Sequence, residues 1–271
     1  MKRTIYALVA FILLIMSLNS CKKPPESSPA PVYNMNFTLS AGTAPLLPGP
    51  GHVVTNTTLR YYLNYVQFYV GYPRLEKADG TEVPITNLFV VEFNDEPVAT
   101  PNSVYNNTFS FSVPAGTYTG IKFGIGVPDK ILDTIKHFHY GLNDPLSADY
   151  WGMLWPGVDS VIRNIAIDML ADTSKQQNQA VNRDYTFHIL EDAPNSHAVN
   201  IYSDILFPEA FTVSNGDSRT DTFNLDFNKV FFNIANPIDL RNSVSGDMNT
   251  AQNIPLGEMI NKNFYSSITL K

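Results

Sequence analysis

The chain has 271 residues, of which 44% are hydrophobic and 12% aromatic, and its formal net charge is −7. An acidic chain without a basic stripe argues against nucleic-acid binding, and a single cysteine excludes an internal disulfide. The length suits one large β domain or two small ones, whose stability comes from an aromatic core.

The N-terminal segment has the composition of a targeting signal. An apolar run over residues 5–16 follows a positively charged start and is too short to span a bilayer comfortably. Residues 18–21, Leu-Asn-Ser-Cys, resemble the lipobox of bacterial lipoproteins, in which the cysteine is lipidated and begins the mature protein. We therefore expect residues 1–20 to be a signal peptide and residues 21–32, rich in Pro, Ser and Lys, to be a flexible tether.

Cys21 also bears on the location of the protein. The alternative to a lipid anchor is an ordinary secretory signal with an incidental cysteine. Lysines follow Cys21 at positions where an aspartate is associated with inner-membrane retention. The sequence therefore favours a lipid anchor in the outer membrane, facing the periplasm or the cell surface.

Residues 33–271 have no internal repeat or boundary, so we expect a single domain. The strand candidates are rich in β-branched and aromatic residues and are separated by Gly/Pro turns, as in an antiparallel β-sandwich with long loops. They cover residues 35–40, 58–72, 87–93, 108–113, 118–127, 161–169, 184–190, 198–206 and 222–232. One or two short helices are expected, over residues 129–137 and 255–262.

The strongest strand pattern covers residues 58–72, where aromatic and β-branched residues alternate. Strict alternation assigns one face to Leu59, Tyr61, Leu63 and Tyr65 and the other face to Tyr62, Asn64, Val66 and Phe68. Both faces of this strand are therefore expected to be covered.

Both tryptophans of the chain lie in residues 144–157, where Pro and Gly surround them. Trp151 and Trp155 in this setting predict a rigid aromatic loop against the core, because an exposed indole is costly. The loop is either a ligand site or a plug for the core.

Sequence motifs of catalysis are absent or weak. Gly124 and Gly126 lack the third glycine of a dinucleotide-binding loop, and no Walker, His-Glu-x-x-His or Gly-x-Ser-x-Gly motif occurs. Asp217, Asp221 and Asp226 do not have the spacing of a calcium-binding EF-hand. No carboxylate pair is singled out for glycoside hydrolysis, so we expect a protein that is not an enzyme.

The histidines are more informative. His137 and His139 would share one face of a strand and could chelate a metal, whereas on a helix they would point apart. The helical pattern of residues 131–136 favours a solvated turn, and both interpretations stay open. His188 lies between Phe187 and Ile189 in an apolar strand. It is either a half-buried histidine with satisfied hydrogen bonds or a metal ligand.

Residues 59–64, 113–118, 123–127, 142–145 with 150–151, and 187–189 follow one another in an order that resembles the MbnP family. These are copper-binding periplasmic proteins associated with methanobactin operons, and the family also includes lipoproteins. The Asp-Pro and Tyr-Trp pairs followed by the Phe-His-Ile strand are the most specific part of the resemblance.

The resemblance implies a β-rich domain that binds copper. In the family, a tryptophan near the Tyr-Trp element can be oxidised to a kynurenine-type ligand by a partner dihaem cytochrome c peroxidase of the MauG-like group, and histidine supplies a nitrogen ligand. Position by position, these ligands correspond to Trp151 and His188. Imidazole suits both oxidation states of copper, and an oxidised indole gains an aniline nitrogen and a carbonyl.

The sequence departs from the family pattern at several positions. The third position of the family's Trp-x-Trp is Met153, and the second tryptophan is displaced to Trp155. Leu190 replaces the glycine after Phe-His-Ile. Asn36 and Thr38 occupy the N-terminal strand, which has no second histidine.

Two functions of different classes follow. The first is a membrane-tethered periplasmic copper-binding protein. Its candidate ligands are His188 and Trp151, with Met153, His137 and His139 as weaker candidates. The alternative is a structural or ligand-binding lipoprotein with the same fold and no metal, in which Trp151 and Trp155 anchor the core or bind a glycan or peptide.

Overall fold

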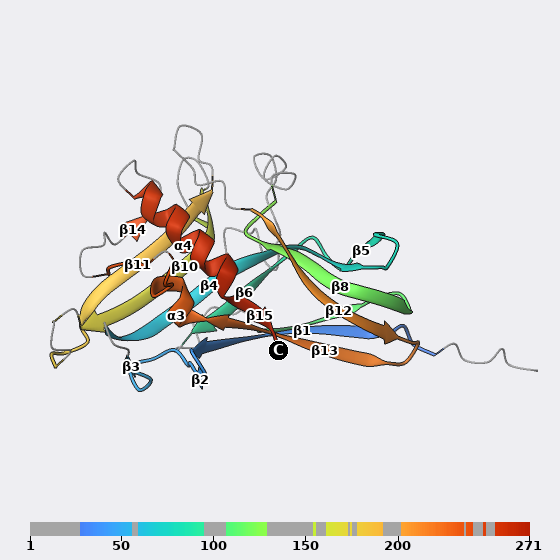
Figure 1. Cartoon of the computed structure of the whole chain (residues 1–271), viewed down its shortest axis with the longest axis horizontal. Helices are drawn as coiled ribbons and strands as arrows, with labels where there is room; N and C mark the ends of the chain where they lie inside the picture. Colours follow the sequence, from blue (N-terminus) through green and yellow to red (C-terminus); the bar gives the residue numbers. More distant parts are fainter. Residues whose placement is uncertain are drawn as a thin grey trace, which may run out of the picture.

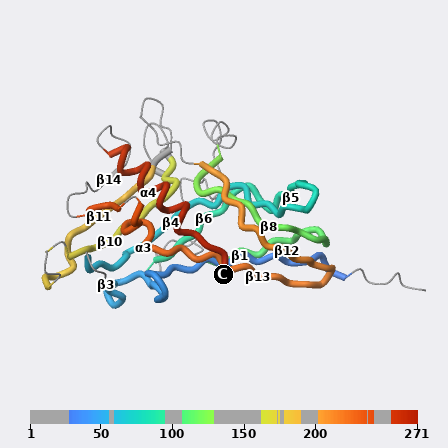
Figure 2. The backbone as a smooth tube through the Cα atoms, viewed as in Figure 1, coloured from blue at the N-terminus to red at the C-terminus, as the bar shows by residue number. Residues whose placement is uncertain are grey.

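The structure, a computed structural model, describes residues 28–55, 59–94, 107–128, 154–155, 161–172, 174, 178–191, 202–235, 237–240, 246–247 and 253–271. These residues form two β-sheets and two helices (Figure 1, Figure 2). The predicted all-β sandwich class is confirmed, because strands make up both layers around the described core.

The smaller sheet contains β1 (Val32–Ala41), β2 (Ala44–Pro45), β7 (Thr108–Ser112), β13 (Ser218–Asp226) and β15 (Ile268–Leu270). Its order is β15-β13-β1-β2, and β7 also pairs with β1. β1 and β13 are parallel, which departs from the expected antiparallel sandwich. A long stretch of chain separates these two strands, so no tight hairpin forces them to be antiparallel.

The larger sheet is built around the long strand β4. Its strands are β3 (Val54–Thr55), β4 (Arg60–Glu76), β5 (Glu82–Pro84), β6 (Leu88–Asn94), β8 (Gly116–Ile125), β9 (Leu154–Trp155), β10 (Val161–Asp172), β11 (Arg183–Glu191), β12 (Asp204–Val213) and β14 (Gly246–Asp247). The order is β12-β8-β4-β10-β11-β14, with β3, β5 and β6 also paired to β4 and β9 to β10. The predicted strand at residues 198–206 instead begins at Asp204 within the described residues.

β4 does not keep strict alternation. Its register with β10 shifts between Asp168, which pairs with Tyr65, and Met169, which pairs with Leu63. Such a β-bulge reverses the side-chain alternation. The core side chains of β4 include Tyr61 and Leu63 before the bulge and Val66, Phe68 and Val70 after it, and Leu59, just before the strand, also lies in the core. The assignment of Tyr65 to the same face as Leu63 is therefore wrong, and so is that of Val66 and Phe68 to the opposite face.

The helices follow β13 and precede β15. α3 (Phe227–Phe231) occupies part of the strand expected over residues 222–232, because the Asp226 side chain accepts a hydrogen bond from Asn228 N and caps a helix there. α4 (Ile254–Ser267) confirms the helix expected at residues 255–262 and extends further. The helix expected at residues 129–137 lies outside the described residues.

The core between the sheets is aromatic. The ring of Phe37 in β1 lies 5.9 Å from Phe68 and 6.0 Å from Phe123 of the larger sheet, and 5.3 Å from Phe223 of the smaller one. Phe264 of α4 packs edge-on against Phe68 at 5.1 Å, so α4 closes one side of this core. No helix of the described residues is long and apolar enough to cross a membrane.

The segment just before β1 contacts the domain. Gly216 N donates to Pro29 O at 2.8 Å, and Val113 N donates to Pro31 O at 3.0 Å. The end of the expected tether, residues 29–31, is therefore docked on the domain. Cys21 lies outside the described residues.

Candidate functional site

The face of the larger sheet that points away from the shared core carries polar residues from several strands. Gln67 of β4 pairs with Glu92 of β6 and with Ala166 of β10, and Ala166 pairs with His188 of β11. Residues directly opposed in a sheet project to the same face. This row therefore brings an amide, a carboxyl group and an imidazole to one side of the sheet.

A second row lies beside the first. Tyr65 of β4 pairs with Asp168 of β10, and Asp168 pairs with Thr186 of β11. The bulge in β4 places Tyr65 in this row, away from the core. We call Tyr65, Gln67, Glu92, Asp168, Thr186 and His188 the polar face.

His188 is the predicted ligand that the structure describes. It is only 7% exposed, so it is more buried than expected. Its Nε2 lies 3.4 Å from Tyr65 Oη and 3.7 Å from Asp168 Oδ1. The second distance is too long for a hydrogen bond, so the imidazole and the carboxyl group face each other without a direct bond between these two atoms.

Burial makes the carboxyl group of Asp168 harder to ionise. Desolvation raises the pKa of Asp168, and the opposing effects of His188, Thr186, Tyr65 and Arg163 offset it only in part. Burial likewise raises the pKa of the Tyr65 hydroxyl. Asp168 Oδ1 is itself buried and has no hydrogen-bond partner in the described part of the chain.

Glu92 and Gln67 form the second buried group of the polar face. Gln67 Nε2 donates to Glu92 Oε1 at 2.6 Å, and the two residues are 3% and 8% exposed, respectively. Burial raises the pKa of Glu92 to about 7, although the hydrogen bonds from Gln67 and Asn94 lower it. Gln67 Oε1 is buried without a hydrogen-bond partner among the described residues.

The described residues include donor atoms of the types that bind copper, but their number is too small for a copper site. His188 supplies an imidazole nitrogen, and Asp168 supplies a carboxylate oxygen beside it. Over the described ranges no group of three or more His, Cys, Asp or Glu side chains could hold a metal ion. The other predicted ligands, Trp151, Met153, His137 and His139, lie outside those ranges.

The backbone around the second tryptophan is described. Leu154 and Trp155, expected in a loop, form the short strand β9 and pair with Ile162 and Val161. Ile162 also pairs with Glu191 on β11, three residues beyond His188. The chain that follows Trp151 thus joins the larger sheet near the end of the strand that carries His188.

The N-terminal strand contributes no donor to the polar face. Asn36 Nδ2 donates to Thr222 Oγ1 at 3.4 Å, and Thr38 Oγ1 donates to Asn224 Oδ1 at 3.0 Å. These contacts lie within the smaller sheet, between β1 and β13. Asn36 and Thr38, the positions considered for a second histidine, therefore belong to a different sheet from His188.

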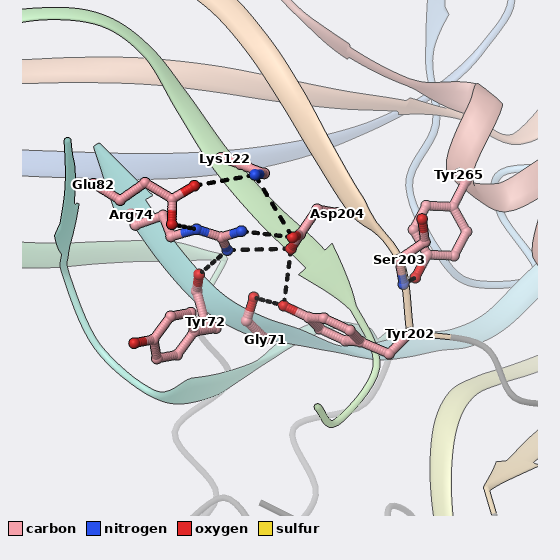
Figure 3. Close-up of polar contacts among 9 residues, drawn as sticks. All are labelled: Gly71, Tyr72, Arg74, Glu82, Lys122, Tyr202, Ser203, Asp204 and Tyr265. Atoms are coloured by element: carbon pink, nitrogen blue, oxygen red, sulfur yellow. Dashed lines mark hydrogen bonds and ion pairs between the residues drawn. The ribbon is translucent and has the colours of Figure 1, made fainter. Parts of the chain in front are cut away.

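A separate charged network joins β4, β5, β8 and the start of β12 (Figure 3). Arg74 Nε contacts Glu82 Oε2 at 2.7 Å, and the two terminal nitrogens of Arg74 reach the two carboxylate oxygens of Asp204 at 3.1 and 2.5 Å. Arg74 also donates to Tyr72 O at 2.9 Å, and Lys122 Nζ lies 3.0 Å from Glu82 Oε1. Opposite charges compensate one another here, so we infer that this network stabilises the fold and is not a binding site.

Two glycines make room for a ring beside this network. Tyr202 Oη donates to Gly71 O at 3.2 Å (Figure 3). A Cβ atom would stand 2.7 Å from Tyr202 Cε2 at Gly71 and 2.3 Å from the same atom at Gly124. Gly124, which could suggest a nucleotide loop, therefore serves close packing.

Asp168, Glu92, Gln67 and Tyr65 were not predicted as site residues. The sequence does carry a signal for two of them, because Glu92 and Asp168 are acidic residues within apolar strand runs at 88–93 and 165–170. A buried carboxyl group needs compensation, so such a residue marks a candidate site. The partners of these residues depend on strand register, which the local pattern does not supply.

The fold and the polar face define an all-β protein of two packed sheets with a buried histidine beside a carboxyl group and a phenol. The sequence model of the MbnP family, described as "MbnP", matches residues 30–253, and the chain belongs to this family. Among solved structures, the chain is similar to "MbnP from Methylosinus trichosporium", with 16% identity, a TM-score of 0.44 and coverage of 81% of each chain. No significant match to a curated protein is found.

Proposed function

We propose that this protein is a copper-binding protein of the bacterial cell envelope, held at the membrane by a lipid on Cys21. It binds or hands over copper and catalyses no reaction. Membership of the MbnP family supports this proposal. The observation that carries it is the buried imidazole of His188, whose Nε2 is directed toward two oxygen donors, Tyr65 Oη and Asp168 Oδ1.

His188 would supply the nitrogen ligand. Imidazole binds both oxidation states of copper, and a ligating histidine is usually oriented by a neighbouring carboxylate or hydroxyl group. Tyr65 and Asp168 fit this role because both face Nε2 of His188, and in that arrangement Nδ1 would be the ligating nitrogen. Burial also limits the access of solvent to the ion, which is one means of tuning a redox metal.

Trp151 would supply the second ligand after oxidation to a kynurenine-type residue. The oxidation requires a partner, for which a MauG-like dihaem cytochrome c peroxidase is the expected class. Met153, His137 and His139 are the further candidate ligands. The pairing of β9 with β10 supports the proximity of this segment to the end of β11.

Mass spectrometry and elemental analysis of the protein from its native host test this proposal. We expect near-stoichiometric copper, a lipid on Cys21, and a mass increase on the Trp151 peptide from added oxygen, with or without loss of carbon. Deletion of the peroxidase gene is expected to abolish the mass increase on that peptide and leave the lipid in place.

The opposite result would be unmodified Trp151 and no copper after copper-replete growth. That result would favour a structural or ligand-binding lipoprotein with the same fold, in which Trp151 and Trp155 bind a glycan or peptide or anchor the core.

A further inference from the structure

The strand β7 of the smaller sheet has an open edge, because it pairs with β1 and with no other described strand. Asn107 O accepts a hydrogen bond from the backbone of β1 at 2.7 Å, and Val113 N donates to Pro31 O at 3.0 Å. The odd-numbered residues of this stretch therefore bond toward β1. Alternate residues of an antiparallel strand direct their backbone groups to opposite sides. The N–H and C=O groups of Ser110 and Ser112 consequently point to the open edge.

The residues of β7 do not protect this edge. The strand reads Thr-Phe-Ser-Phe-Ser and contains no charged residue and no proline. Edge strands are normally blocked by charges, proline or a β-bulge, because their free backbone groups can pair with another chain. β12, an edge of the larger sheet, has all three features, with Asp204, Pro208 and Glu209 and a register shift after Pro208. The contrast indicates that the edge of β7 is suited to pairing with a further strand.

The sequence of β7 is complementary to itself. When two β7 strands pair antiparallel with Ser110 opposite Ser110, Phe109 of each copy lies opposite Phe111 of the other. Both rings contact Phe89, with centroid distances of 4.0 and 5.7 Å, but both stay partly exposed in the single chain. Aromatic pairs opposed across antiparallel strands stabilise a sheet. Pairing of two copies would therefore cover these rings as well as the backbone groups of Ser110.

The charge distribution also favours a second copy as the partner. The net charge of −7 makes two copies repel one another at most approaches. Beside β7, the side chains of β1 on the outer face of the smaller sheet are Asn34 and Asn36, and those of β7 are serine and threonine. This neutral region lets two acidic chains meet without bringing like charges together.

We propose that β7 is a self-association surface, at which two copies of the chain pair their β7 strands antiparallel about a two-fold axis. The axis passes between the two Ser110 residues, whose N–H and C=O groups exchange two hydrogen bonds. The smaller sheets of the two copies then form one continuous sheet. A five-residue edge buries less than the roughly 1,200–2,000 Å² of a stable interface, so the dimer dissociates on dilution. Its formation does not depend on bound copper.

Sedimentation velocity of the full chain, over a range of protein concentrations in a density-matched detergent, measures the association. Ser110→Lys places a lysine directly opposite its counterpart in the paired strands. Ser218→Lys is the matched control, because Ser218 is an exposed serine of the same sheet that lies on β13, away from β7. The hydroxyl groups of Ser110 and Ser218 both bond to the Asn34 side chain, at 2.6 and 3.0 Å.

We expect a concentration-dependent dimer for wild type and for Ser218→Lys. Self-association of Ser110→Lys should be weaker by at least about tenfold, because opposed like charges repel. Wild type that stays monomeric at every concentration would overturn the inference, even if a peptide of another protein bound the edge. Species that grow beyond the dimer, or equal association of Ser110→Lys and wild type, would overturn it as well.

Amide hydrogen exchange of wild type tests the paired strand without a variant. The Ser110 amide should exchange more slowly as the protein concentration rises, because it becomes hydrogen-bonded only in the dimer. The Phe111 amide, which is directed toward β1, should show no such dependence. A dimer in which the exchange of Ser110 is independent of concentration would place the contact elsewhere on the molecule and refute the role of β7.

Discussion

Replacement of Glu92 by glutamine tests the electrostatic description of the polar face. Glu92 is 8% exposed and hydrogen-bonded to Gln67. Its pKa is raised from 4.5 to about 7 because burial disfavours the charged form. Glutamine keeps nearly the same shape and cannot ionise, so the substitution removes the cost of the buried charge.

The sign and size of the effect follow from linkage. Between pH 4.5 and about 7 the unfolded chain has already lost the Glu92 proton while the folded protein still holds it. The native state therefore binds more protons than the unfolded state, and stability falls as the pH rises through this window. The interval from 4.5 to about 7, at about 1.36 kcal/mol for each pKa unit, corresponds to a penalty of about 3 kcal/mol above pH 7.

Urea unfolding of wild type and Glu92→Gln at pH 5, 6, 7 and 8 measures this penalty. We expect the stability of the variant relative to wild type to increase with pH by up to about 3 kcal/mol and to level off above about pH 7. Glu258→Gln, at an exposed position of α4, is the control and should show no such dependence. A Glu92→Gln difference that is the same at pH 5 and pH 8 would refute the assignment of a raised pKa to Glu92.

Two further predictions concern the network in Figure 3. Gly124→Ala should destabilise the protein by about 1–3 kcal/mol, because the new Cβ would lie 2.3 Å from Tyr202 Cε2; Gly51→Ala, with no atom within 4 Å of its Cβ, should change stability by less than about 0.5 kcal/mol. Arg74→Met should cost about 1–3 kcal/mol, because the partly exposed carboxylate of Asp204 would lose the nitrogens that approach it at 3.1 and 2.5 Å. Thermal unfolding measures both effects, and an unchanged melting temperature in either variant would contradict the corresponding contact.

The sequence predicts most of the fold because strand formation depends on local pattern. Alternation of apolar residues located the strands now seen as β1, β4, β6, β7, β8, β10 and β11, with shifts of a few residues at their ends. It could not predict the parallel pairing of β1 with β13, because that contact joins residues far apart in the chain. The end of β13 was missed because Asp226 caps a helix within an apolar run that also resembles a strand.

The candidate site was predicted only in part for a related reason. His188 stands out in its strand because it is a lone imidazole between apolar residues. Tyr65 was assigned to the wrong face because a bulge at one position reverses every later side chain of the strand. Asp168 and Glu92 gain their roles from neighbours on other strands, so no local pattern identifies their partners.

Copper binding by His188 is the part of the proposed function on which the other ligand assignments depend. The most direct test measures copper bound per chain by equilibrium dialysis for wild type, His188→Gln and His52→Gln, all purified from the native host. His52 is exposed and is the matched control. We expect near-stoichiometric copper in wild type and His52→Gln and its loss in a folded His188→Gln. Retention of copper by His188→Gln, or absence of copper from all three proteins, would contradict copper binding by His188.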